Sequence, residues 1–359
     1  MKTWLCFGFM VLSNLLQAQQ KTKNVIVVTL DGMRWEEVFK GADPVLINDS
    51  TFTPDRKDLR AKFWADTEAE RRRKLFPFFW STIATQGQLY GNRAFDNKVN
   101  NANPYWFSYP GYNEIFTGYP DTAMNTNDKV PNPNENVFEF LIKRPEFKDR
   151  AAVFSSWDVF SAIFNEPRSK VPVSAGFQQV ENVSPGMQLL NDMQMHAAKT
   201  VGDDVRPDML TYYIAREYMK AKKPRLLYIA FDETDDYAHA GKYDFYLNTA
   251  RNEDEWIGEL WKYVQSTPEY KDQTTMIILT DHGRGDKVKS NWQHHGQKIE
   301  DACQIWMAVI GPDTNPLGEV KTPMQLYQKQ VAATVAKLLG YDFKPNHPVG
   351  DPVSSIYSK

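Results

Sequence analysis

The sequence contains few cysteines, no excess of positive charge and no long hydrophobic run after its first 20 residues. With only Cys6 and Cys303, the chain has no disulfide framework, so it must be stable through its core or through bound metal. Lysine and arginine (42) nearly balance aspartate and glutamate (45), which argues against a protein dedicated to nucleic-acid polymers. After residue 20, no segment reaches the roughly 18 apolar residues of a membrane span. The composition, 42% hydrophobic and 24% charged, is typical of a globular protein with a large core.

The first 18 residues have the pattern of a secretory signal peptide. Lys2 precedes an apolar stretch from Trp4 to Leu16, and Ala18 supplies a small residue for cleavage. A buried N-terminal helix is the alternative interpretation. We expect an exported protein, periplasmic or secreted, whose mature chain comprises residues 19–359.

Several apolar runs of the sequence predict an α/β fold. The predicted strands, rich in β-branched residues, are 24–30, 225–231, 274–279 and, more weakly, 151–154. The predicted helices are 75–86, 209–220, 248–265 and 324–339. Strands that alternate with helices indicate a doubly wound, mainly parallel sheet between two layers of helices.

Two polar segments are predicted to lie outside the sheet. Residues 41–74 are dense in charge and are typical of a surface insertion, while 119–136 are rich in Pro, Asn and Asp and should form a loop. We expect the segments 41–74 and 119–220 to contribute a substrate cap, because specificity commonly resides in such connections.

Acidic and histidine residues follow each of the three strong strands. They are Asp31, the segment from Asp232 to His239, and the pair Asp281–His282, with His294–His295 a few residues later. The carboxyl ends of parallel strands share one edge, where ligands bind in open α/β sheets. Carboxylates brought this close repel one another unless cations lie between them, and Asp with His suits zinc or a similar ion. Manganese or iron would also accept such ligands.

In their order and spacing these segments resemble the alkaline phosphatase superfamily, on the branch of type I phosphodiesterases and nucleotide pyrophosphatases. The matching segments are Val25–Met33, Ser108–Gly118, Asp235–His239, Thr280–Gly283 and His295–Gly296, with Gln330–Gly340 resembling the closing helix of such enzymes. The resemblance covers most of the mature chain and implies one alkaline phosphatase-like catalytic domain over residues 19–359.

The resemblance implies two divalent metal ions, with zinc the expected element. One ion would be held by Asp235, His239 and His295, and the other by Asp31, Asp281, His282 and the nucleophile, Ser108. His294 is a rival to His295. A helix beginning at Ser108 would add backbone N–H donors for the phosphoryl oxygens. An asparagine after this helix contacts the phosphoryl group in this branch, and both Asn125 and Asn127 lie in the right region.

Five further residues are candidates for substrate binding. Tyr109, Tyr112 and Asn113 flank the nucleophile and form either a pocket wall or ordinary packing. Together with Tyr105 and Trp106, these tyrosines could stack on a base or an aryl group, although core packing is the alternative. Arg34 and Arg284 are candidates for clamping the extra charge of a phosphate monoester, or else are surface residues.

The predicted function is therefore an exported, metal-dependent hydrolase of small phosphate esters, with diester or pyrophosphate bonds favoured, working through a phospho-Ser108 intermediate. The nearest alternatives are a phosphomonoesterase and a sulfatase-like hydrolase, although Tyr112 stands where the sulfatase signal requires arginine. An alternative of another class is an inactive relative that only binds metal or ligand.

Overall fold

The computed structural model describes residues 20–180 and 184–357. The predicted signal peptide, residues 1–18, lies outside these residues. Among the described residues, no helix has both the length and the apolar character needed to cross a bilayer.

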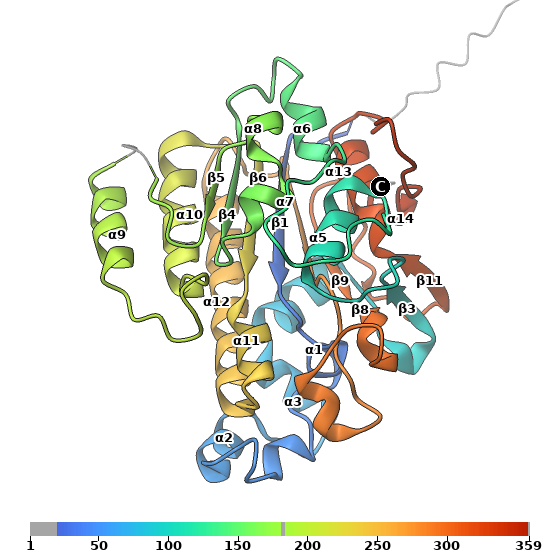
Figure 1. Cartoon of the computed structure of the whole chain (residues 1–359). Coiled ribbons are helices and arrows are strands. Elements are labelled where there is room, and N and C mark those ends of the chain that lie inside the picture. Colours follow the sequence, from blue (N-terminus) through green and yellow to red (C-terminus); the bar gives the residue numbers. More distant parts are fainter. Residues whose placement is uncertain (1–19, 181–183, 358–359) are drawn as a thin grey trace, which may run out of the picture.

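A sheet of eight strands forms the centre of the molecule (Figure 1). In spatial order its strands are β10 (Gly318–Glu319), β2 (Gln88–Tyr90), β9 (Met307–Ile310), β7 (Thr274–Leu279), β1 (Asn24–Leu30), β6 (Leu226–Phe231), β4 (Ala151–Ser155) and β5 (Val173–Ala175). The strands from β7 to β5 are parallel, whereas β9 runs antiparallel to both of its neighbours. The structure thus confirms the predicted α/β class and mainly parallel sheet.

Helices cover both faces of this sheet, and the buried side chains of β1 therefore alternate between two cores. Ile26, Val28 and Leu30 point into one core and Val25 and Val27 into the other. The first core lies against α1 (Trp35–Lys40), α2 (Arg56–Phe63), α3 (Glu68–Leu75), α10 (Asp208–Lys222) and α12 (Tyr243–Ser266). The second lies against α5 (Ser108–Thr117), α6 (Val137–Ile142), α7 (Phe160–Ile163), α13 (Val331–Leu338) and α14 (Ser354–Tyr357).

The remaining elements are short or lie at the periphery. They are α4 (Ala84–Gln86), α8 (Glu166–Ser169), α9 (Pro185–Met195), which stands at one side of the molecule in Figure 1, and α11 (Glu233–His239). A second sheet consists of β11 (Met324–Tyr327), β3 (Asn97–Asn100) and β8 (Gln304–Ile305).

The predicted strands are all present, and two of the predicted helices, 209–220 and 248–265, lie within α10 and α12. The helix predicted over 324–339 is wrong in its first part. Residues 324–327 form β11, which pairs in parallel with β3, and the helix α13 begins only at Val331. The helix predicted over 75–86 begins later, at Pro77, because Leu75 ends α3 and proline fits the first position of a helix, and residues 79–83 form a π-helical turn before α4.

The two predicted insertions differ in their relation to the sheet. Residues 41–74 form α2, α3 and a short turn that bury Leu46, Leu59 and Phe63 against the first core. Residues 119–136 contain no helix or strand, as predicted. The longer segment 119–220 contributes β4 and β5 to the main sheet, so only its connections are free to cover the site.

Candidate active site

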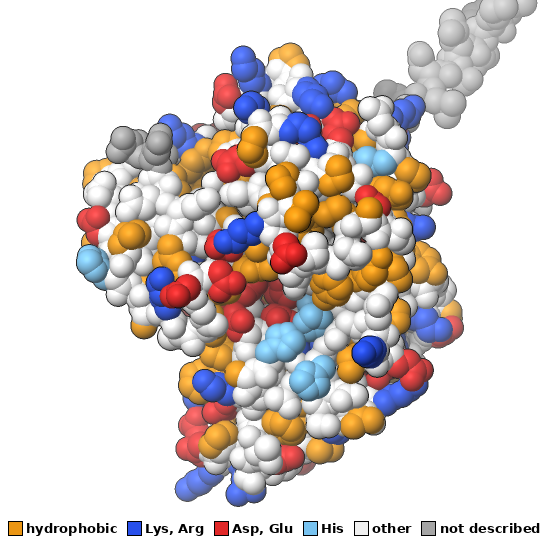
Figure 2. Space-filling view, in the orientation of Figure 1, with side chains coloured by type: hydrophobic (Ala, Val, Ile, Leu, Met, Phe, Trp, Pro, Cys, Tyr) orange, Lys and Arg blue, Asp and Glu red, His pale blue; other side chains and the backbone are white. Residues whose placement is uncertain are grey.

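The predicted site residues gather at the carboxyl ends of β1, β6 and β7, which are adjacent in the sheet. Asp31 directly follows β1, Asp281 and His282 follow β7, and Asp235 lies on α11 after β6. In the space-filling view this region is a hollow with acidic side chains at its floor and histidines along one edge (Figure 2). The parallel register of the three strands therefore accounts for the meeting of residues up to 250 positions apart, here Asp31 and Asp281.

Each of the three aspartates has one carboxylate oxygen held by a donor and the other turned toward a histidine. For Asp31, Oδ2 accepts a 2.7 Å hydrogen bond from the Tyr112 hydroxyl, and Oδ1 lies 3.3 Å from His282 Nε2. For Asp281, Oδ1 accepts from the Gly32 backbone N–H at 3.1 Å, and Oδ2 lies 3.4 Å from the same imidazole nitrogen.

The third aspartate, Asp235, follows the same rule with different partners. Its Oδ2 lies 3.2 Å from His239 Nε2, whereas its Oδ1 both accepts a hydrogen bond from Arg284 and lies 3.7 Å from His282 Nε2 and 3.8 Å from His295 Nε2. A Cβ at Gly32, whose φ is +57°, would come within 2.6 Å of Asp235 Oδ1 and 2.9 Å of Arg284 Nε. Glycine at this position is therefore what lets the end of β1 approach the Asp235–Arg284 pair.

The histidines turn their Nε2 atoms toward the carboxylates. His282 Nδ1 is 3.0 Å from the Gly283 carbonyl and His295 Nδ1 is 3.3 Å from the Trp106 carbonyl, contacts that leave Nε2 free on each ring. His239 Nε2 and His295 Nε2 are 2.9 Å apart. His294, the rival to His295, is exposed, and its hydrogen bonds with the described residues are all made by its backbone.

Ser108 is the first residue of α5, and its Oγ is 3.4 Å from His282 Nε2. The backbone N–H donors expected at this helix start are fewer than predicted. Tyr109 N–H already donates to Asn127 Oδ1 at 3.0 Å, and Pro110 has no N–H. Both Asn125 and Asn127 are exposed, but only the Asn127 side chain lies against the residue that follows Ser108, and Asn125 has no side-chain hydrogen bond with the described residues.

Burial and neighbouring charges raise the pKa of two of the three site aspartates and lower the pKa of the third. Burial raises the pKa of Asp31 well above its ordinary value, and the neighbouring Asp235 adds to this. Burial also raises the pKa of Asp281, with repulsion from Asp31. Burial would raise the pKa of Asp235 too, but the Arg284 charge and the bond with His239 outweigh it and hold that pKa well below the usual range. Burial lowers the pKa of His295 to about 2, so this imidazole is neutral.

These residues fit divalent metal ions. Asp31 Oδ1 and Asp281 Oδ2 are buried carboxylate oxygens that have no hydrogen-bond partner, an arrangement that is costly unless a cation lies beside them. Two groups have ligand atoms close enough to share an ion: Asp31, Asp281 and His282, and Asp235, His282 and His295. His282 lies between the two groups, and His239 extends the second one through its contacts with Asp235 and His295.

The candidates for substrate binding are mostly buried and engaged elsewhere. Tyr109 directs its hydroxyl to the Val130 carbonyl, and Asn113 donates to the Tyr119 carbonyl, so both placements favour packing. Tyr112 is also buried, but its hydroxyl contacts Asp31. Tyr105 and Trp106 are half-buried, which leaves part of each ring exposed near the start of α5.

The two arginines proposed as clamps are interior residues. Arg34 is 0% exposed and pairs with Glu37, and it also donates to the Gly285 carbonyl. Arg284 is 1% exposed and pairs with Asp235. Neither guanidinium faces the hollow as a free cation, and both are part of the interior that surrounds the site.

Sequence reasoning missed one residue that positions the site. The buried Asp208 carboxylate accepts the backbone N–H groups of Asp232 and Glu233, each at 2.9 Å, at the start of α11. It thereby fixes the helix that carries Asp235 and His239. In the sequence, Asp208 stands directly before the predicted helix 209–220, where an aspartate normally caps that same helix. Nothing in the sequence indicates that it binds the start of a different helix, α11.

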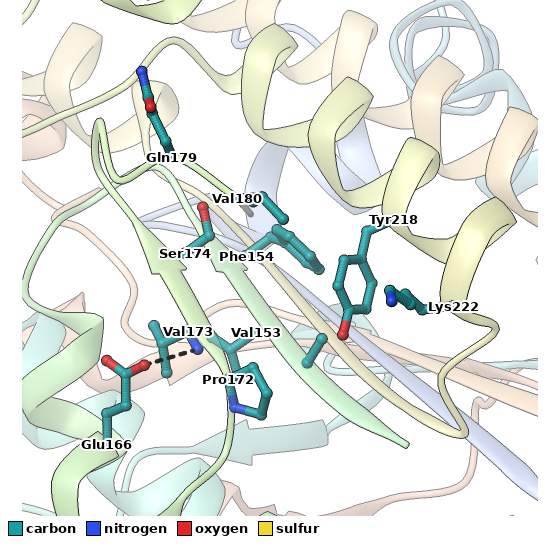
Figure 3. A pocket seen from close by; sticks show the side chains of 11 residues that line it. Val153, Phe154, Glu166, Pro172, Val173, Ser174, Gln179, Val180, Tyr218 and Lys222 are labelled. Atoms are coloured by element: carbon teal, nitrogen blue, oxygen red, sulfur yellow. Dashed lines mark hydrogen bonds between the residues drawn. The ribbon is translucent and has the colours of Figure 1, made fainter. Parts of the chain in front are cut away.

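A cavity of about 400 Å³ lies between β4, β5 and α10, with Phe154, Val180 and Tyr218 among its lining residues (Figure 3). None of the predicted catalytic or metal-binding residues lines it. The candidate active site is therefore the hollow at the carboxyl ends of β1, β6 and β7 and not this cavity.

Comparison with known proteins identifies the family and the fold. A family model described as type I phosphodiesterase / nucleotide pyrophosphatase matches residues 42–349. The match begins after Asp31, which the fold nevertheless places among the other site residues. No curated protein matches the chain significantly.

Several solved structures share the fold. A mutant of the alkaline phosphatase PafA is 10% identical, with a TM-score of 0.63, and the alignment covers 94% of this chain and 99% of the other. The lipoteichoic acid synthase LtaP from Listeria monocytogenes is 13% identical, with a TM-score of 0.58 and coverages of 95% and 75%. The phosphonate monoester hydrolase of Agrobacterium radiobacter is 12% identical, with a TM-score of 0.55 and coverages of 93% and 77%.

Proposed function

We propose that this chain, which belongs to the type I phosphodiesterase/nucleotide pyrophosphatase family, is a two-metal hydrolase of small phosphate esters with Ser108 as its nucleophile. One observation carries the proposal. Asp31 and Asp281 each have one oxygen held by a donor and the other turned toward His282, Asp235 lies against His239, and the Ser108 hydroxyl lies 3.4 Å from His282. This arrangement is suited to holding cations next to a hydroxyl group.

The ligand assignment follows the same contacts. Asp31, Asp281 and His282, together with Ser108, would hold one ion, and Asp235, His239 and His295 the other, with zinc the favoured element. Such ions lower the pKa of a coordinated hydroxyl and offset charge on phosphoryl oxygens. The Ser108 oxygen then attacks phosphorus, the leaving alcohol departs, and water cleaves the phospho-Ser108 ester.

The chain's own residues orient these groups. Tyr112 and the Gly32 N–H fix the ligand oxygens of Asp31 and Asp281. Asn127, which accepts the Tyr109 N–H, is left with its amide NH₂ to donate to a phosphoryl oxygen beside Ser108. This donor would replace the N–H that Pro110 lacks.

Cleavage of diesters or pyrophosphates is favoured over that of monoesters. A monoester carries one more negative charge than a diester, and the arginines considered for that charge, Arg34 and Arg284, are buried in pairs with Glu37 and Asp235. The proteins of similar structure include an alkaline phosphatase and a phosphonate monoester hydrolase, so the experiment below compares both classes of substrate.

The experiment measures metal content and hydrolysis on the purified mature protein. The substrates are p-nitrophenyl phosphate, bis-p-nitrophenyl phosphate and p-nitrophenyl sulfate. We expect about two metal ions per chain and fastest cleavage of the diester. A faster monoester reaction would make the protein a phosphatase, and fastest sulfate cleavage would make it sulfatase-like. A chain that binds no metal and cleaves none of the three would contradict the proposal and favour an inactive relative.

We also propose that residues 1–18 direct export. N-terminal sequencing of the protein recovered from the periplasm or medium of an expressing cell should begin at Gln19. Recovery of a chain that still begins at Met1, in the cytoplasm, would contradict export.

A further inference from the structure

Arg284 contacts both the side chain and the backbone of a proposed metal ligand. Its Nη2 donates both to Asp235 Oδ1 and to the Asp235 carbonyl, the latter at 3.1 Å. Its Nη1 donates to the Gln293 carbonyl at 2.7 Å. A single guanidinium thus joins the helix that carries Asp235 to the segment that ends in His295.

These two ligands reach the site from different parts of the chain. Asp235 lies on α11, whereas His295 follows a 3-10 turn over Lys289–Gln293, and the described contacts of the His295 ring are with His239, His282, Asp235 and the Trp106 carbonyl. Arg284 contacts both backbones, two residues before His295 and at Asp235 itself. Its planar fork suits such bridging, which a single ammonium point charge reproduces only in part.

Arg284 does for Asp235 what Tyr112 does for Asp31 and what the Gly32 N–H does for Asp281. It holds Asp235 Oδ1, the oxygen that lies 3.8 Å from His295 Nε2, while Asp235 Oδ2 lies 3.2 Å from His239 Nε2, so Arg284 fixes the carboxylate between these two histidines. Only here is the donor a charged residue, and its buried guanidinium forms an ion pair with the carboxylate of Asp235.

We propose that Arg284 is a positioning residue for one of the two metal ions, the ion held by Asp235, His239 and His295. The inference rests on the proposed two-metal function. The other group, Asp31, Asp281 and His282, makes no hydrogen bond with the Arg284 side chain among the described residues, so it should retain its ion when Arg284 is replaced.

The test compares Arg284→Met and Arg284→Lys with the wild-type protein by zinc titration against a competing chromogenic chelator. We expect wild type to bind two ions and Arg284→Met to bind one with unchanged affinity and the second about 10- to 100-fold more weakly. Arg284→Lys should recover most of the second affinity, because an ammonium can still hold Asp235 Oδ1. If Arg284 only stabilised the fold, Arg284→Met would weaken the binding of both ions, and Arg284→Lys would not restore the affinity of one ion alone.

Arg34→Met is a matched control, because Arg34 is an equally buried arginine whose partner, Glu37, is not a proposed ligand. It should lower the unfolding midpoint of the metal-free protein but leave two ions bound with wild-type affinity. The proposal is overturned if Arg284→Met binds both ions as wild type does. It is also overturned if Arg284→Met and Arg34→Met lose ions to the same extent. If the wild-type protein binds no ion, both the two-metal function and this inference fail. If the wild-type protein binds two ions and Arg284→Met binds both with the same affinities, only this inference fails.

Discussion

The hydroxyl of Tyr112 donates a 2.7 Å hydrogen bond to Asp31 Oδ2, which leaves Asp31 Oδ1 as the unpartnered oxygen that lies 3.3 Å from His282 Nε2. The tyrosine is fully buried one helical turn after Ser108, so α5 supplies both the proposed nucleophile and the group that orients a proposed metal ligand. The nucleophile and Asp31 are thereby tied to one rigid element.

Replacing Tyr112 with phenylalanine should weaken metal binding at the group of Asp31, Asp281 and His282. The change removes only the hydroxyl, so Asp31 becomes free to rotate and metal affinity should fall about 10- to 100-fold at that one site. Zinc titration with a competing chelator measures this. Tyr109→Phe is the control, because that hydroxyl bonds to the Val130 carbonyl instead, and its zinc affinities should match wild type. Equal affinities in all three proteins would contradict the role of Tyr112.

Ser108→Ala should reduce turnover of bis-p-nitrophenyl phosphate by a factor on the order of a thousand or more, because no other hydroxyl is proposed to attack phosphorus. Metal content should change little, since three protein ligands remain at each site. Turnover and metal analysis on the same preparation check both statements. Near-full activity would mean that Ser108 is not the nucleophile.

The neighbouring histidines provide a matched pair. His295→Ala should cost the protein one of its two metal ions, because His295 Nε2 lies 2.9 Å from His239 Nε2 and 3.8 Å from Asp235 Oδ1. His294→Ala should retain both ions, because this side chain is exposed and makes no hydrogen bond within the part of the chain that the structure describes. Elemental analysis after dialysis distinguishes the two. Loss of metal in His294→Ala alone would reverse the assignment.

The asparagines left open by the sequence form a second pair. Asn127→Ala should lower kcat for the diester about 10- to 100-fold, because it removes the amide proposed to donate to a phosphoryl oxygen. Asn125→Ala, at an exposed position without side-chain hydrogen bonds, should behave as wild type. Steady-state kinetics with metal-replete protein measures both. The proposal for Asn127 fails if both variants retain the wild-type kcat.

Glu36 should make the unfolding free energy depend on pH. Its burial outweighs the attraction of the Arg34 charge and raises the pKa of Glu36 to about 8, compared with about 4.3 in an unfolded chain. The stability contributed by the bound proton is fully present below about pH 4.3 and is lost as pH rises through about 8.

Glu36→Gln removes this titration without changing the size of the side chain. The difference in unfolding free energy between variant and wild type should therefore shift in favour of the variant between about pH 5 and pH 9. Urea unfolding with chelator present in every sample keeps metal binding out of the comparison. A difference that stays constant over this range would show that Glu36 does not titrate as described.

The amino-acid sequence alone determined the sheet and the identity of the groups at its edge. Continuous β-branched runs at 24–30, 225–231 and 274–279 predict strands buried on both faces, and the parallel arrangement places Asp31, Asp235 and Asp281 at one edge. These are local signals combined with a general rule of topology, so they need no knowledge of particular tertiary contacts.

Only the tertiary structure decided which oxygen of each aspartate is free and what role each arginine takes. Tyr112 and Asp31 are 81 residues apart, and Arg284 and Asp235 are 49 apart, so no local pattern links them. The same holds for Met324–Tyr327, which has apolar residues compatible with a helix but forms β11 because β3 offers it a partner strand. Hydrogen-bond partners distant in sequence, rather than local propensity, fix these features.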